Sequence, residues 1–169
     1  MDTIESILTR RSIRHYTGQP VSKETIETLL KCGMYAPSAS NKQPWHFIVI
    51  DDKTILAEIM AMHPHSKMLG EAQCAILVCG DEENALAPGY IPIDCSAATE
   101  NILLAAHALG LGACWLGIHP REERIDAIKQ IIGLPGKIHP VSLLSIGYPV
   151  KQPSVPIRFD VTKIHWNRW

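Results

Sequence analysis

Three arginines and a serine are concentrated near the start of the chain, in Arg10-Arg11-Ser12-Ile13-Arg14. Guanidinium groups bind phosphate oxygens through paired hydrogen bonds, and residues 10, 12 and 14 share one side if this stretch is extended. The cluster therefore predicts a site for a small anion, and a phosphate monoester matches it well. The competing interpretation is a solvated helix end, because cations are favoured at a helix C-terminus. The cluster alone leaves both interpretations open.

A second polar stretch, PSASNKQPW at 37–45, combines small hydroxyls and two amides with prolines near both ends. The prolines favour an ordered loop. Hydroxyl and amide groups suit the edge of an isoalloxazine ring, where hydrogen-bond donors and acceptors alternate. The alternative is an ordinary connection between two elements.

Other common chemistries lack their sequence signatures. Neither G-x-G-x-x-G after a strand nor G-x-x-x-x-G-K-[ST] occurs, so neither the dinucleotide fingerprint nor the P-loop explains the arginines. A nucleophile elbow is also absent, and Ser38 and Ser40 have no histidine at a recognisable spacing, which argues against covalent hydrolysis. The five cysteines are scattered, mostly in apolar runs, and are interpreted as buried thiols. The histidines form no ligand pair, so we expect no metal site.

The composition predicts one folded domain over 1–169, because 46% of the residues are hydrophobic and 20% are charged. A formal net charge of −1 provides no global field for nucleic acid or an anionic membrane. An interaction module built on the basic cluster, Trp166 and Trp169 is therefore a weak alternative. The chain starts without an apolar leader and contains no long apolar run, so we expect a cytoplasmic protein.

Periodic patterns indicate alternating helices and strands. Ile4, Ile7 and Leu8 form an amphipathic stripe, and Ser22 and Asp94 are expected to cap helices. We expect helices near 2–10, 22–35, 54–62, 94–109 and 121–132, and strands near 45–50, 75–79, 113–118 and 140–146. The sum is an α/β (α+β) fold with a central mixed sheet of about four to five strands flanked by helices. The last part, about 148–169, has little periodicity and is expected to lie across a surface already formed, such as that of a second subunit.

Taken together, these features resemble the FMN-dependent nitroreductase family, and specifically its short single-domain members. The resemblance covers nearly the whole chain. It is carried by RRSIR, APSASNKQPWHF, LGLGACWLG, SIGYP and the terminal RFD and HWNRW segments. It implies a nitroreductase-like fold in an intertwined homodimer, with the tail of about 148–169 extended across the partner.

The resemblance also assigns site residues by matching position. It places the FMN phosphate and nearby atoms at Arg10, Arg11, Ser12, Arg14 and Arg158. It also identifies a loop that reaches the flavin of the other subunit, formed by Pro37, Ser38, Ala39 and Asn41. It places Lys67 near the ring and the ribityl hydroxyls, and beside the reactive edge of the ring it places Leu116, Gly117 and Ile118. Larger members carry an acidic residue where this chain has Gly117, and no side chain is assigned as catalytic.

The implied activity is a ping-pong reaction with tightly bound FMN and NAD(P)H as co-substrate. A nitroaromatic, a quinone or a related small molecule would accept the electrons. The main alternative is a flavin-binding or flavin-consuming protein without nicotinamide-dependent reductase activity.

Overall fold

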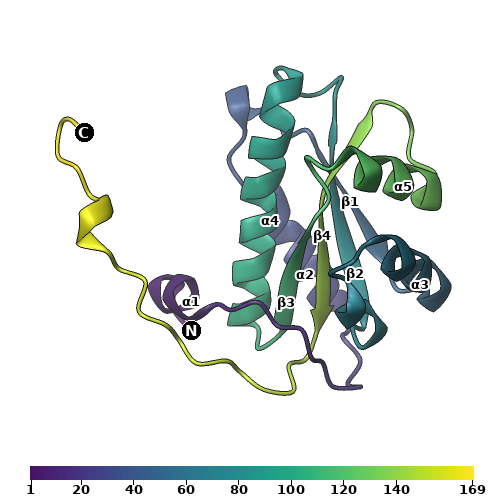
Figure 1. The fold of residues 1–169 in the computed structure, drawn as a ribbon, viewed down its shortest axis with the longest axis horizontal. Coiled ribbons are helices and arrows are strands. Elements are labelled where there is room, and N and C mark those ends of the chain that lie inside the picture. The colour runs from purple at the N-terminus through teal and green to yellow at the C-terminus, as the bar shows by residue number, and fades with distance from the viewer.

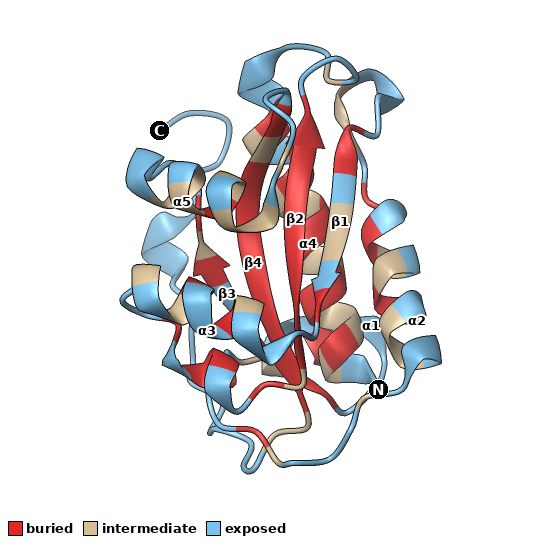
Figure 2. Ribbon diagram, turned by 90° about the vertical axis from the view of Figure 1, so that its right-hand side faces the viewer, coloured by how far each residue is buried: buried red, intermediate tan, exposed pale blue.

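A sheet of four strands forms the centre of the computed structural model, which describes residues 1–169. Its strands are β1 (Trp45–Ile50), β2 (Cys74–Asp81), β3 (Gly112–Gly117) and β4 (Ile138–Gly147). They lie in the order β1-β2-β4-β3, so β1 and β3 form the two opposite edges (Figure 1). Both central strands are almost entirely buried (Figure 2).

Helices cover both faces of the sheet. The helices are α1 (Thr3–Thr9), α2 (Lys23–Met34), α3 (Lys53–Met62), α4 (Ile91–Ala108) and α5 (Glu122–Ile132). Successive residues of a strand face opposite sides, so Ala75 and Leu77 of β2 pack with α3 and α5. The intervening Ile76 and Val78 pack with α2 and α4. Each face thus has its own core of 17 buried residues.

Three of the five helices begin at a capping side chain, whereas α4 and α5 have none. Ser22 caps α2 as expected, because its Oγ accepts a hydrogen bond from the Thr25 N–H at 3.2 Å. Asp94 was expected to cap the long helix, and this prediction is wrong, since α4 already begins at Ile91. Pro92 lies in its first turn, where the missing N–H of proline costs no helical hydrogen bond. The Asp94 carboxylate therefore remains available for another partner.

The predicted fold class is confirmed, and the number of strands is four. All three ladders are antiparallel, however, and the isolated bridge between Ser12 and Ala113 supplies the parallel pairing. The parallel part of the mixed sheet that we expected is therefore this single bridge. Apolar periodicity indicates which side chains face a core, but it carries no information about the direction of a neighbouring strand.

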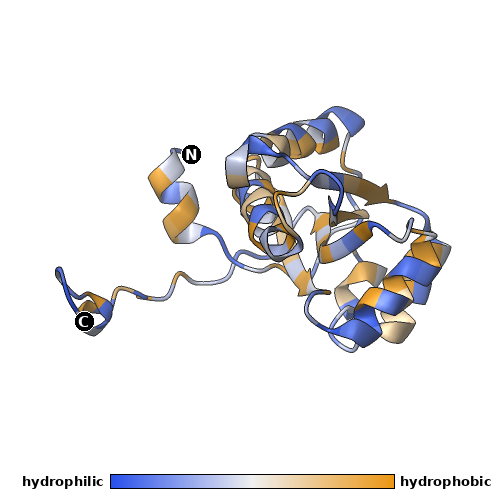
Figure 3. Cartoon of the chain, turned by 90° about the horizontal axis from the view of Figure 1, so that it is seen from above, coloured by the Kyte–Doolittle hydropathy of each residue, from blue (hydrophilic) through white to orange (hydrophobic).

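Both ends of the chain project from the same side of the body (Figures 1 and 3). Helix α1 contacts α4, where the Ser6 hydroxyl donates a hydrogen bond to the Leu104 carbonyl at 3.1 Å. Its apolar stripe is exposed, with Ile4 and Leu8 both more than 60% accessible. The tail after Gly147 is extended apart from one short turn at Val161–Lys163. None of the helices has the length and apolar character needed to cross a membrane.

Candidate cofactor site at the edge of the sheet

The basic segment that follows α1 is fastened to the start of β3. The Ile13 N–H donates to the Ala113 carbonyl at 2.9 Å. A Cβ at Gly112 would lie 2.7 Å from Ile13, so only glycine allows this close approach. The buried Tyr16 hydroxyl then bonds the Ile13 carbonyl at 2.8 Å and the Ser145 hydroxyl at 2.7 Å. The arginine-bearing backbone is therefore held in a defined position.

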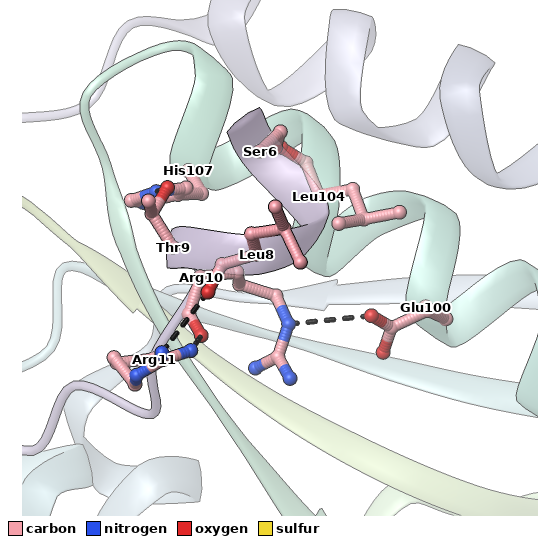
Figure 4. Close-up of polar contacts among 8 residues, drawn as sticks. All are labelled: Ser6, Leu8, Thr9, Arg10, Arg11, Glu100, Leu104 and His107. Carbon is pink, nitrogen blue, oxygen red and sulfur yellow. Dashed lines mark hydrogen bonds and ion pairs between the residues drawn. The ribbon is translucent and has the colours of Figure 1, made fainter. Parts of the chain in front are cut away.

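Within this segment, Arg10 and Arg11 make different contacts (Figure 4). Arg10 Nε lies 3.2 Å from a carboxylate oxygen of Glu100 on α4. Arg11 turns back to the end of α1, where its guanidinium donates to the carbonyls of Leu8, at 3.0 Å, and of Arg10. Arg11 thus matches the alternative interpretation of the basic cluster, in which a cation lies at the C-terminal end of a helix. Both Nε atoms are nevertheless buried without a hydrogen bond of normal geometry.

Positive charge accumulates at this point from both ends of the chain. Burial lowers the pKa of Arg11, and the positive charges of Arg158 and Arg10 lower it further. Arg158 is therefore close enough to interact with Arg11, although 147 residues separate them in sequence. Like charges gathered around buried, unpaired N–H groups are an arrangement that an anion would stabilise.

A cavity of about 910 Å³ opens beside the same segment. Its walls are Ser12, Ile13, Arg14 and His15 on one side and residues 150–154 on the other. The start of the tail is fixed there by two backbone hydrogen bonds, from Thr17 N to the Tyr148 carbonyl at 2.8 Å and from Val150 N to the His15 carbonyl at 3.1 Å. A volume of this size lies within the range of small-molecule sites. Of the predicted phosphate residues, Ser12 and Arg14 line this cavity.

The other end of β3 carries the segment expected beside the reactive edge of a flavin. Leu116 and Ile118 are buried in the core, so their side chains cannot reach a ligand. The Ile118 backbone is also occupied, since its N–H donates to the Val141 carbonyl and its carbonyl accepts from the Arg121 N–H. Gly117 is partly exposed, and a Cβ there would meet no atom closer than 4.0 Å. The four residue steps from Ala113 to Gly117 span about 13 Å along the sheet edge. The edge therefore connects the basic segment with an accessible stretch of backbone.

A third segment, 63–71, joins the same two points. At one end, His63 Nε2 lies 3.2 Å from the Gly117 carbonyl oxygen. At the other end, Glu71 Oε2 accepts a hydrogen bond from the Tyr16 N–H at 3.1 Å. Lys67 lies between these contacts at the start of a short turn, Lys67–Gly70, and its side chain is exposed. Lys67 is thus carried by a segment whose ends touch both parts of the candidate site.

The loop expected to approach a flavin lies elsewhere in the chain. Its residues Pro37, Ser38, Ala39 and Asn41 precede β1, the sheet edge opposite β3, and none of them lines the cavity. The loop is held against α4, where the Ala39 N–H donates to Asp94 at 3.0 Å. A single chain therefore does not bring this loop together with the basic segment.

Sequence reasoning missed His63 and Arg124, which both bond the Gly117 carbonyl, and it misassigned Asp94. His63 carries no local signal, because its partner is 54 residues away. Arg124 does carry one, since it lies in the first turn of α5, where a positive charge opposes the helix dipole. A positive charge at the start of a helix, as at Arg124, indicates that another group stabilises that side chain, and here the group is the Gly117 carbonyl.

Comparisons with known proteins show which family and fold this chain shares. The model of the nitroreductase family matches residues 7–63 and 56–148. A relative from Methanothermobacter thermautotrophicus, provisionally named NADH dehydrogenase/NAD(P)H nitroreductase, is 43% identical over 100% of this chain and 88% of its own. A crystal structure from Parabacteroides distasonis with the same provisional name has a TM-score of 0.95 at 39% identity, covering 99% of this chain and 98% of that one.

A further structure, described as a nitroreductase in complex with FMN from Desulfovibrio desulfuricans, has a TM-score of 0.87 and 30% identity. It covers 100% of this chain and 98% of its own. The chain belongs to the nitroreductase family.

Proposed function

We propose that this protein is an FMN-dependent oxidoreductase that takes hydride from NAD(P)H and reduces a nitroaromatic, a quinone or a related small acceptor, and that it works as a homodimer. The observation that carries this proposal is the edge of β3. It has an anion-binding segment at one end, open backbone at Gly117 at the other, and Lys67 on a segment that connects the two.

The residues present fit such a cofactor. The Nε atoms of Arg10 and Arg11 are buried without a hydrogen bond, and the only carboxylate beside them is that of Glu100, at Arg10. The guanidinium of Arg158 adds a further positive charge near Arg11. Ser12 and Arg14 add a hydroxyl and a guanidinium at the adjoining cavity. Together these five residues would hold the phosphate. The absence of a Cβ at Gly117 leaves room for a flat ring to approach the backbone.

These positions define what the cofactor and the protein would each contribute to the reaction. When bound, FMN supplies the transfer of hydride from the nicotinamide and of electrons to the acceptor. The chain orients the cofactor through its phosphate end. The positive ammonium of Lys67 favours the reduced form of the cofactor, which carries more negative charge than the oxidised form. Protons for the product come from water in this proposal, because no side chain of the site is assigned as an acid.

The homodimer is supported by apolar surface that one chain leaves uncovered. Ile157, Phe159 and Trp166 of the tail are 79–97% exposed, and the stripe of α1 is exposed as well. Exposed apolar surface of this extent is typical of an interface. A second copy would cover it, take the tail of about 148–169 across its surface, and bring its loop of residues 37–41 to the first copy's basic segment.

The test begins with the absorbance of the purified protein. We expect an FMN spectrum, and we expect Arg14→Glu and Arg158→Glu to release the flavin, whereas Lys23→Glu, an exposed position on α2, retains it. Retention by both arginine variants would remove the phosphate assignment. Anaerobic NADH or NADPH should bleach the bound flavin. Binding without bleaching by either nucleotide would favour a flavin-binding protein without reductase activity.

A further inference from the structure

The Gly117 carbonyl receives two side-chain donors from different elements. His63, which follows α3, places Nε2 at 3.2 Å from this oxygen. Arg124, in the first turn of α5, places Nη1 at 2.7 Å. A carbonyl at the edge of a sheet is ordinarily solvated, so a buried imidazole and a guanidinium on the same oxygen form a specific tether.

The protonation state of His63 is fixed by its surroundings. Its Nδ1 accepts a hydrogen bond from the His65 N–H at 3.2 Å, so the proton of the neutral ring is on Nε2 and is donated to Gly117. His63 is only 2% exposed. Burial lowers its pKa, and the nearby charge of Arg124 acts in the same direction. The ring is therefore a neutral donor at neutral pH.

The tether holds one end of a peptide whose other end is also bonded. The Ile118 N–H, in the same peptide unit as the Gly117 carbonyl, donates to the Val141 carbonyl at 3.3 Å. In an antiparallel ladder, N–H and C=O groups alternate between the two sides of a strand. Gly117 therefore directs its own N–H and C=O away from β4, toward the open edge. Glycine adopts many backbone conformations, so without the tether this edge could rearrange easily.

We propose that His63 and Arg124 are positioning residues that lock the Gly117–Ile118 peptide and thereby set the affinity and reduction potential of the flavin beside it. This inference rests on the proposed function, since it requires FMN at the edge of β3. Arg124 has a second effect, because its positive charge, fixed at this edge, favours the reduced cofactor. His63 is neutral and acts through geometry alone.

The two residues can be separated by conservative and disruptive variants. His63→Gln retains an N–H donor, whereas His63→Leu removes it. Arg124→Lys retains the charge, whereas Arg124→Met removes it. Because Arg124 is only partly buried, its variants remain informative if His63→Leu fails to fold.

The experiment measures the FMN dissociation constant by fluorescence quenching and the midpoint potential of bound FMN by anaerobic dye titration. We expect His63→Leu and Arg124→Met to weaken FMN binding about threefold to tenfold. We expect Arg124→Met to lower the potential and His63→Gln and Arg124→Lys to restore most of the lost affinity. A merely structural pair would change the melting temperature and leave the potential unchanged.

An independent readout needs no flavin. In the apoprotein, amide hydrogen exchange at Ile118 should be faster in His63→Leu and Arg124→Met than in the wild type, because the peptide is no longer held at its carbonyl. Unchanged exchange together with an unchanged potential would overturn the inference. Wild-type protein that binds no FMN would instead overturn the proposed function, so the two failures are distinguishable.

Discussion

The Oδ1 atom of Asp94, in the first turn of α4, accepts a hydrogen bond from the backbone N–H of Ala39 at 3.0 Å. Asp94 is 3% exposed, and its second oxygen is buried without a hydrogen bond. The loop that it anchors contains three left-handed residues other than glycine, Ser40, Asn41 and Gln43. Such conformations persist where surrounding contacts impose them, and they are frequent at binding sites.

Asp94→Ala should therefore loosen this loop and weaken FMN binding about tenfold, as expected for the loss of a hydrogen bond to a charged group. Asp94→Asn retains an oxygen acceptor and should lie between Asp94→Ala and the wild type. Titration of the apoprotein with FMN measures both. Equal affinities in all three proteins would show that the anchor has no part in the site.

Gly112→Ala should displace the basic segment, because the new methyl group would lie 2.7 Å from Ile13. Overpacking of this kind costs about 1–3 kcal/mol of unfolding free energy. Gly136→Ala is the matched control, since a Cβ at Gly136 meets nothing within 4 Å. Urea unfolding and FMN titration of both variants test this prediction. It fails if Gly112→Ala is as stable and binds as tightly as Gly136→Ala.

His63 should make the fold less stable in mild acid. Its pKa is lowered in the folded state, chiefly by burial, so the unfolded chain binds the proton more readily. The stabilisation of the fold by this difference in pKa is complete above pH 6.5, the pKa of His63 in the unfolded chain. It is lost as the pH falls from there toward the lower pKa of His63 in the folded chain. Comparing urea unfolding at pH 7.5 and 5.5 should give a larger loss for the wild type than for His63→Gln, which cannot titrate. His107, whose pKa is also lowered, is present in both proteins and cancels in the comparison. Equal losses would contradict a neutral, buried His63.

Ile157→Asp should shift the protein toward a monomer. The side chain is 97% exposed in the single chain, so a carboxylate there costs nothing unless a second copy covers it. Light scattering after size-exclusion chromatography gives the mass directly. Lys163→Asp, also exposed on the tail, reverses charge without removing apolar surface and should leave the dimer intact. A variant at Ile157 with the same mass as the wild type would argue against a tail that packs on a partner.

The sequence predicts most of the elements because their signals are local. The continuous apolar run at 75–79 can only be a buried segment. Ser22 caps helix α2, which begins at the next residue. The candidate site is less predictable because its contacts are long-range. Whether Asp94 caps α4 or anchors Ala39 depends on how the chain folds back over a separation of 55 positions in sequence. The burial of Leu116 and Ile118, which keeps their side chains away from a ligand, follows from the register of β3 on β4 and not from composition.

In the proposed dimer, each site combines the basic segment of one chain with the 37–41 loop of the other, and complementation tests this arrangement most directly. Arg14→Glu and Asn41→Asp chains with different affinity tags should each fail to retain FMN. Coexpressed and purified through both tags, the mixed dimer should bind about one FMN per two chains, since one of its sites receives both intact parts. A mixed dimer that remains free of flavin would contradict the claim, because it would mean that both parts come from the same chain.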